Sequence, residues 1–281
     1  MKTANQLKQQ LLDIKNNNWS IPSDTDKYEL ALEMLDNIGS VDPEFRDELI
    51  LELLSDMIVE NHLTDGEVKN LLELLLSENH LFYNIGNVED DSVFNRTFTL
   101  LIIVAMLYRH NQNTDNLFTE EEIKRICTEV VSYTRQEKDA RGYVEIKGWA
   151  HSTAHTADVF NVIAQCTEIK KPKLILILEA IKDMVCINYY TYINGEDERL
   201  ISAVIEILKK DILNDNEFIN WIKSFEDIQL AGKYPADHNL TSNRKNFLSA
   251  LYFRLKRKNE NTSFMDTIEQ VINNMTPTHF K

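Results

Sequence analysis

The chain has 281 residues, 45 of them acidic and 30 basic, and its formal net charge at pH 7 is −15. This charge would repel a phosphate backbone and an anionic membrane surface, so we expect neither nucleic acid nor a membrane as a partner. Only 7 glycines and 5 prolines interrupt the chain, which favours long helices over a sheet protein with many tight turns.

The apolar runs and the cysteines indicate the cellular compartment in which the protein is expected. No stretch approaches the ~20 consecutive apolar residues of a membrane-spanning helix, and the start of the chain lacks the apolar core of a signal peptide. The cysteines Cys127, Cys166 and Cys186 are scattered among apolar helical neighbours, without a C-x-x-C pair that would indicate zinc or redox chemistry. We therefore expect buried thiols in a cytoplasmic protein.

In chain order, the sequence shows one amphipathic helical pattern after another. The first, near residues 3–15, lacks a firm apolar stripe, so residues 1–18 are expected to be loosely attached. Asp42-Pro43 and the capping box Thr64-Asp65-Gly66-Glu67 are typical helix starts. Later helices are expected to begin near residues 92, 118, 149, 171, 197, 216, 242 and 262. Residues 143–146 are too short to found a sheet.

The order of these helices predicts the architecture. Helices that begin near 43, 92, 149, 197 and 242 alternate with a second series, and members of one series are about 45 to 57 residues apart. Short connections make neighbours antiparallel, so the N-termini of the first series lie along one edge. We predict a single all-α domain over residues 1–281, an irregular α-solenoid of antiparallel helical hairpins of the HEAT or armadillo kind. An α/α toroid or an unrepeated helical bundle is the alternative.

The segment from Gly148 to Asp158 is the most unusual part of the chain. His151, His155 and Asp158 stand at i, i+4 and i+7, which is one face of a helix with about 3.6 residues per turn. Such a set suits a divalent metal, acid–base catalysis, or a hydrogen-bonded helix N-terminus without chemistry. The helical protease motif H-E-x-x-H is absent, because Ser152 replaces its glutamate. A bound divalent metal is one alternative, but we expect that the protein has no cofactor.

Acidic residues followed by arginine open four of the five first-series helices. They are Asp42 with Arg46, Asp91 with Arg96, Glu196 and Asp197 with Arg199, and Asp237 with Arg244. Arginine in a first turn opposes the helix dipole unless an anion is near. One interpretation is a ladder of carboxylate–guanidinium pairs between hairpins. In the other, an anionic ligand is bound beside the histidine helix by a set of side chains: Arg96, Arg141, Trp149, Glu196, Asp197 and Arg199.

Three motifs carry a resemblance to a known family. They are Gly142-Tyr143-Val144 with Gly148-Trp149-Ala150-His151-Ser152 and Ala154-His155-Thr156-Ala157-Asp158, then Phe94-Asn95-Arg96-Thr97-Phe98, and Gly195-Glu196-Asp197-Glu198-Arg199-Leu200. With these motifs the chain resembles a bacterial family, domain of unknown function 2785, over roughly residues 45–255. Thr97 stands where that family would have serine. The resemblance implies one helical unit and brings no activity with it.

Two functions from different classes fit these residues. The favoured one is a helical-repeat protein that binds a peptide, a partner protein or a small anionic ligand in a pocket around the histidine helix, since glycine-rich phosphate loops and activated serine or cysteine motifs are absent. The alternative is an acid–base or metal-dependent, hydrolase-like enzyme in which His151 and His155 transfer protons or bind metal and Asp158 orients one imidazole. A closed pocket containing Arg96 and Arg199 would support the enzyme, and an open groove the binding protein. Substrate, metal and oligomeric state stay open.

Overall fold

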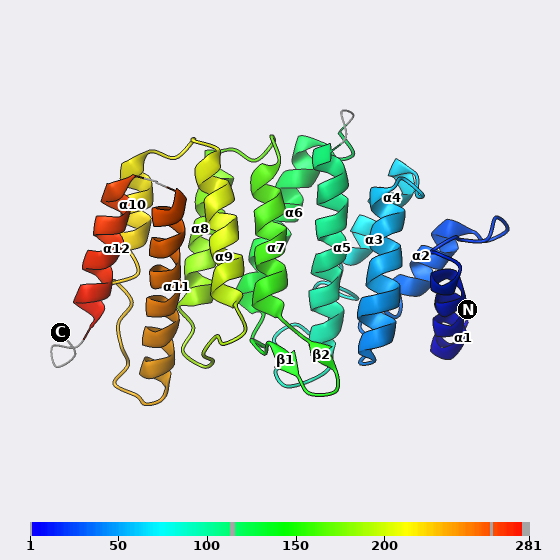
Figure 1. Ribbon diagram of the computed structural model, residues 1–281, viewed down its shortest axis with the longest axis horizontal. Helices are drawn as coiled ribbons and strands as arrows, with labels where there is room; N and C mark the ends of the chain where they lie inside the picture. Colours follow the sequence, from blue (N-terminus) through cyan, green and yellow to red (C-terminus); the bar gives the residue numbers. More distant parts are fainter. Residues whose placement is uncertain (1, 113–115, 259–260, 277–281) are drawn as a thin grey trace.

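The computed structural model describes residues 2–112, 116–258 and 261–276, and this part of the chain is almost entirely helical (Figure 1). Its only strands, β1 (Tyr143–Val144) and β2 (Gly148–Trp149), form one short antiparallel hairpin. The all-α class is confirmed.

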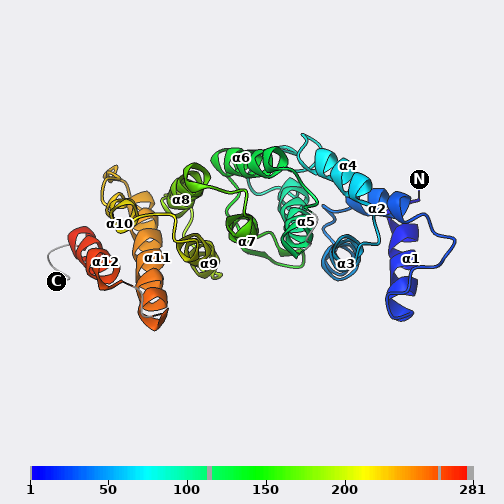
Figure 2. The ribbon, with the colours of Figure 1, turned by 90° about the horizontal axis from the view of Figure 1, so that it is seen from above.

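The helices alternate between two layers that run along the molecule (Figures 1 and 2). The front layer of Figure 1 contains the π-helix η1 (Glu44–Leu51), α3 (Glu52–Val59), α5 (Ser92–Gln112), α7 (Ser152–Gln165), α9 (Glu196–Lys209) and α11 (Ala236–Lys258). The layer behind it contains α4 (Asp65–Leu75), α6 (Glu120–Gln136), α8 (Lys171–Val185) and α10 (Asp215–Lys223). Helices α1 (Ala4–Asn16) and α2 (Lys27–Leu35) lie at the N-terminal end of the array, and α12 (Thr262–Met275) lies at the C-terminal end.

Front-layer helices pack on their neighbours in chain order: α3 on α5, α5 on α7, α7 on α9 and α9 on α11. The most extensive of these interfaces are those of α7 with α9 and α5. Ala150, Ala154, Ala157 and Ala164 are fully buried, which fits the expected role of small residues in letting neighbouring helices approach closely. One hydrophobic core extends from Leu7 to Val271.

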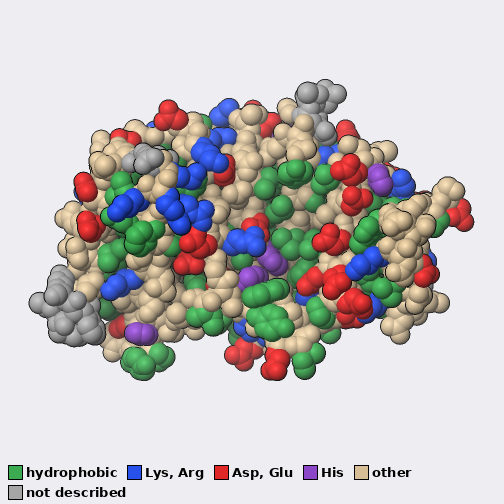
Figure 3. All heavy atoms as spheres, in the orientation of Figure 1, with side chains coloured by type: hydrophobic (Ala, Val, Ile, Leu, Met, Phe, Trp, Pro, Cys, Tyr) green, Lys and Arg blue, Asp and Glu red, His purple; other side chains and the backbone are tan. Residues whose placement is uncertain are grey.

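The front face is curved and its charge is uneven. Helices α1 and α11 extend further forward than α7, so α7 lies at the back of a broad concavity (Figure 2). Lysine and arginine side chains gather over the α9–α11 half of this face and acidic side chains over the α3 half, with histidine side chains between them (Figure 3). The histidine segment therefore lies at the centre of the concave face.

Helix α5 is the one described helix that is long and apolar enough to cross a membrane by length and composition, with a mean hydropathy of 1.2. Its apolar residues are not consecutive, because polar residues such as Asn95, Arg96 and Thr99 interrupt them. Inside the protein, 78% of its most apolar window is buried. Helix α5 contacts η1, α3, α4 and α7. These neighbours cover most of its apolar surface, as expected for a core helix.

Several local predictions are corrected by the structure. The segment that follows Asp42-Pro43 is π-helical up to Leu51 and only then α-helical. Helix α1 does have an apolar stripe, because Leu7, Leu11 and Ile14 are buried. Helix α11 begins directly after Pro235, earlier than the predicted start near residue 242. The capping box at Thr64 is present as predicted, with the Thr64 N–H donating to Glu67 at 2.7 Å.

Candidate functional site

The histidine helix begins later than predicted, because α7 starts at Ser152 and His151 is its N-cap residue. The backbone of His151 is left-handed, with φ 48° and ψ 39°. Its N–H donates to the carbonyl of Arg141 at 3.0 Å, and the N–H of Ala150 donates to Gly142 at 2.8 Å. A non-glycine residue in this region costs on the order of 1–3 kcal/mol, so the hairpin that precedes the helix must hold it in place.

A column of aromatic rings runs from the hairpin into the core. Tyr143 packs edge-on against Trp149 at 5.0 Å, and Trp149 stacks on His151 with a centroid distance of 4.4 Å and an interplanar angle of 22°. His151 meets His155 edge-on at 5.9 Å, and His155 meets Phe98 of α5 at 5.6 Å. The two predicted imidazoles are therefore adjacent, although only His155 lies within the helix.

Glu196 of α9 is the carboxylate that faces His151. Its Oε1 lies 3.7 Å from His151 Nε2, and the Glu196 side chain is 1% exposed. Burial raises the pKa of Glu196, whereas burial and then Arg199 lower the pKa of His151. These opposite shifts bring the two pKa values closer together, and they oppose the formation of a full ion pair between the two residues. Neither facing atom has a hydrogen-bond partner among the described residues.

His155 is held neutral in the fold. Burial, with a smaller contribution from His151, lowers its pKa to about 3. Its Nδ1 is buried and has no hydrogen-bond partner in the described part of the chain. An unsatisfied buried polar atom costs on the order of 1–3 kcal/mol and needs an explanation, such as a bound polar group.

The Asp158 carboxylate binds Arg199 rather than an imidazole. Arg199 Nη1 lies 2.7 Å from Asp158 Oδ1, and the Arg199 side chain is 56% exposed. Burial raises the pKa of Asp158, and Arg199 opposes that shift. Asp197 accepts from the N–H of Glu198 and lines a separate, very small cavity against Asn243. The ligand-type atoms of His151, His155 and Asp158 do not form one of the groups that lie within 4.8 Å of one another in the described part of the chain.

Arg96 and Arg141 are engaged elsewhere. Arg96 is fully buried and binds Glu137 through Nε at 2.6 Å and Nη2 at 2.9 Å. Arg141 binds Asp139, with Nη2 to Oδ2 at 2.6 Å. Both carboxylates lie directly after α6, so Arg96 pairs within the α5–α6 hairpin and Arg141 pairs within its own loop. The pair of Arg199 with Asp158 joins two hairpins, as the ladder interpretation expects. Arg244 departs from it, because its guanidinium donates to backbone carbonyls, including that of Phe225 at 2.9 Å.

Arg46 contributes to the site in a way that the sequence analysis missed. Its guanidinium lies between the rings of Phe94 and Phe98, at 4.3 and 4.4 Å, and donates to the carbonyl of Lys147 at 2.8 Å. Gly148, with φ +82°, lies directly against it, and a Cβ there would meet Arg46 Nη2 at 3.1 Å. Gly148 in the G-W-A-H-S motif was the available signal, since glycine is required where backbone approaches closely at positive φ.

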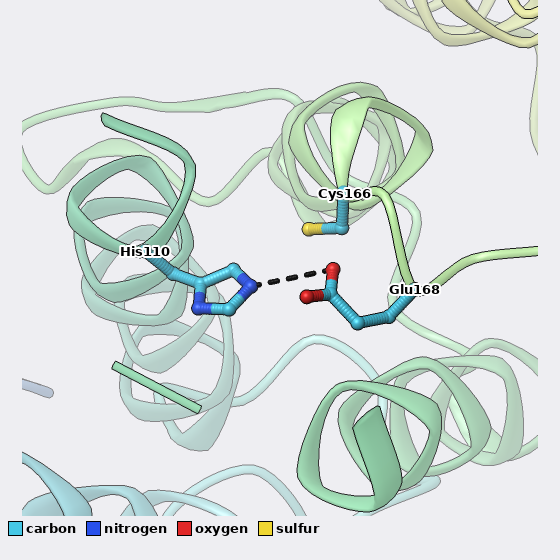
Figure 4. Close-up of side chains that lie close together, drawn as sticks. All are labelled: His110, Cys166 and Glu168. Carbon is cyan, nitrogen blue, oxygen red and sulfur yellow. Dashed lines mark ion pairs between the residues drawn. The ribbon is translucent and has the colours of Figure 1, made fainter. Parts of the chain in front are cut away.

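A second polar cluster joins the other ends of α5 and α7 (Figure 4). His110, Cys166 and Glu168 place their ligand-type atoms within 4.8 Å of one another, and they are the one such group among the residues that the structure describes. His110 Nε2 lies 3.4 Å from Glu168 Oε2. Cys166 was expected to be a buried thiol, and its proximity to His110 was not predicted, because His110 lies far from Cys166 and Glu168 along the chain.

The chemistry of this cluster does not favour a metal site. His110 Nδ1 accepts the N–H of Phe118 at 3.2 Å, so the proton of the neutral ring lies on Nε2, the atom that faces the other two residues. A metal on Nε2 would need that proton removed while Nδ1 still faces a donor. Burial raises the pKa of the Cys166 thiol to about 12, so it is a protonated and poor ligand.

The most enclosed of the larger cavities lies on the other side of α7. It has a volume of about 240 Å³ and is lined on α7 by Ser152, Thr153 and Thr156. His151, His155 and Asp158 do not line it. The concave face and this cavity are therefore two separate places on one helix.

These features define an all-α protein of two helical layers, with an aromatic hairpin and two histidines at the centre of its concave face. The chain belongs to the family described as Protein of unknown function (DUF2785), whose model matches residues 81–253. The resemblance drawn from the motifs is thus confirmed, over a shorter range than residues 45–255. No curated protein and no solved structure matches the chain.

Proposed function

We propose that this protein is an irregular α-solenoid of the HEAT-like kind that binds a partner protein or peptide on its concave face. The alternation of helices between two layers and the packing of each front helix on the next support the solenoid. Such arrays present extended concave surfaces to partners. Helix α7, which follows His151 and contains His155, lies at the back of that concavity (Figure 2).

The observation that carries the proposal is the exposed aromatic hairpin beside Arg199. Tyr143 is 57% exposed, Ile146 85% and Trp149 41%, although all three are large apolar side chains. Tryptophan, tyrosine and arginine are the residues that most often dominate binding energy at protein interfaces. A rigid hairpin supported by Arg46 and His151 presents them in one conformation, which reduces the entropy cost of binding.

The charge pattern of the face indicates the kind of partner. Basic side chains gather over the α9–α11 half and acidic side chains over the α3 half (Figure 3). A segment with the opposite polarity, acidic towards α11 and basic towards α3, would meet complementary potential along its length. Its centre would supply an apolar residue to Trp149.

Capture of partners from cell extract by the purified protein tests the proposal. We expect Trp149→Ala and Arg199→Ala to lose a protein that the parent retains. Tyr234→Ala is the matched control, since Tyr234 is an aromatic residue that is 87% exposed in the loop before α11. Equal capture by all four proteins, or no specific capture by the parent, would contradict the proposal.

The acid–base enzyme is the second candidate, and the buried Glu196 carboxylate that faces His151 Nε2 at 3.7 Å favours it. Its test combines elemental analysis of the purified protein with His151→Ala, His155→Ala and Arg199→Ala. A stoichiometric metal, or stabilisation by a small ligand, that disappears in folded variants would support chemistry at this site. Lower melting temperatures in all three, with no metal or ligand signal in the parent, would assign these residues a structural role.

A further inference from the structure

The cavity behind α7 is a second site, independent of the concave face. It lies between the C-terminal ends of α6 and α8, the N-terminal end of α7, and the segment 187–192. Its inner wall includes the buried residues Ser152, Thr153, Thr156 and Tyr192. Its rim includes the exposed residues Arg135, Lys138, Asp183 and Tyr189. The interior and the rim therefore offer different chemistry.

The inner hydroxyl groups present lone pairs to the cavity, because their protons are already donated. Ser152 Oγ donates to the carbonyl of Asp139 at 2.5 Å, and Thr156 Oγ1 donates to Ser152 at 2.7 Å. Thr153 Oγ1 donates to the Tyr192 hydroxyl, which itself donates to the carbonyl of Met184 at 2.8 Å. Each of these oxygens retains capacity as an acceptor. The wall thus favours a ligand group that donates hydrogen bonds, such as an ammonium.

The charges on the lining divide into two kinds. Glu137 and Asp139 are neutralised by Arg96 and Arg141, as described above. The other three, Arg135, Lys138 and Asp183, form no ion pair within the part of the chain that the structure describes. The mouth of the cavity therefore holds two cationic groups and one carboxylate that form no close ion pair, although Lys182 and Arg135 are near enough to oppose the rise in the pKa of Asp183 that burial causes.

We propose that this cavity binds a small zwitterion, of the class of a free amino acid. The ligand ammonium is accepted by the inner hydroxyl oxygens and, from the rim, by the Asp183 carboxylate, and the ligand carboxylate is bound by Arg135 and Lys138, which also lie on the rim. A ligand with charge of only one sign would leave either the acceptor groups or the two cationic side chains without a partner. The volume of about 240 Å³ is below the ~300–1,000 Å³ of pockets for drug-sized ligands, which suits a ligand of this size.

Thermal unfolding of the full chain with each standard free amino acid at millimolar concentration tests the proposal. We expect at least one to raise the melting temperature, since a ligand that binds only the folded state stabilises it. The best compound is then compared with its decarboxylated amine and its deaminated acid, which should both be much weaker. No stabilisation by any amino acid, or equal stabilisation by the amine or the acid, overturns the proposal.

Two variants locate the binding. Asp183→Asn should weaken the affinity for the best compound by about tenfold, whereas Asp56→Asn, the same change at an exposed position on α3, should leave it unchanged. Ala140→Leu, on the lining, should reduce binding by filling the cavity. Circular dichroism confirms that each variant is folded. Unchanged affinity in both cavity variants, or equal loss in Asp56→Asn, would refute the assignment to this cavity.

Discussion

The ion pair of Arg96 and Glu137 shows how much one residue contributes when it is buried. Arg96 is 0% exposed and Glu137 7% exposed, and the carboxylate also accepts from the Tyr133 hydroxyl at 2.8 Å. Arg96→Met keeps most of the side-chain volume but leaves Glu137 buried and uncompensated. We expect the free energy of unfolding in urea to fall by about 3–5 kcal/mol.

Arg125 and Glu73 provide the matched control. They form a similar two-bond pair between helices, at 2.6 and 2.9 Å, but their side chains are 46% and 58% exposed. Water screens this pair, so Arg125→Met should cost less than about 1 kcal/mol. Similar losses in the two variants would show that burial does not determine the strength of these pairs.

The neutral state of His155 predicts a pH dependence of stability. Its pKa is lowered from an ordinary 6.5 to about 3 in the fold. Between these values the unfolded chain binds more protons, so the free energy of unfolding rises with pH and falls on acidification by about 1.4 kcal/mol per pH unit from this group. His155→Gln should flatten the slope measured in urea between about pH 4 and 6. A variant with the parent's slope would show that His155 is not its source.

At the scale of the element, Gly148 and Gly66 predict opposite effects of one substitution. A Cβ at Gly148 would meet Arg46 and Pro43 at 3.1 and 3.3 Å on a backbone with φ +82°, whereas at Gly66, in the first turn of α4, it would meet nothing within 4 Å. Gly148→Ala should therefore destabilise by about 1–3 kcal/mol. Gly66→Ala should stabilise by up to about 1 kcal/mol. Calorimetric melting temperatures that shift in the same direction in the two variants would contradict the predicted difference between Gly148 and Gly66.

The helices could be predicted from the sequence because their starts depend on local chemistry. The capping residues Thr64 and Thr119 accept hydrogen bonds from residues three positions later, and such spacing is visible in the sequence. The left-handed backbone of His151 depends on the hairpin before it, and from the sequence residues 143–146 were expected only to be too short to found a sheet. The π-helical turn at η1 likewise had no local signal that we recognised.

The candidate site, like the helices, was predictable only where it depends on residues that are close together in the sequence. The adjacency of the two histidines followed from their spacing, and the ladder of charged pairs was one of the two interpretations of the arginines. The partners were not predictable, because Glu137 for Arg96, Glu196 for His151 and Glu168 for His110 come from other elements, more than 40 residues away along the chain. Sequence spacing identifies neighbours on one helix, whereas contacts between helices depend on how the layers pack.

At the scale of the whole molecule, the two-layer array predicts a gradient of local stability. Helices α5, α7 and α9 contact front-layer neighbours on both sides, whereas α1 and α12 lie at the ends. In a linear array each unit is stabilised by its neighbours, so the ends open most easily. Hydrogen exchange followed by mass spectrometry should show the slowest exchange in the central helices. Exchange from α1 or α12 as slow as that from α7 would indicate that the array unfolds as one unit.

Helix α7 has the aromatic hairpin and histidines on one side and the cavity on the other. Its first turn therefore belongs to both, since His151 and Ser152 are consecutive residues that face different compartments. If both compartments are occupied as proposed and one occupant shifts this turn, each must change the affinity of the other by the same factor, because the coupling free energy is reciprocal. The affinity for a partner on the concave face would then depend on the concentration of a small metabolite in the cavity, which the partner does not contact.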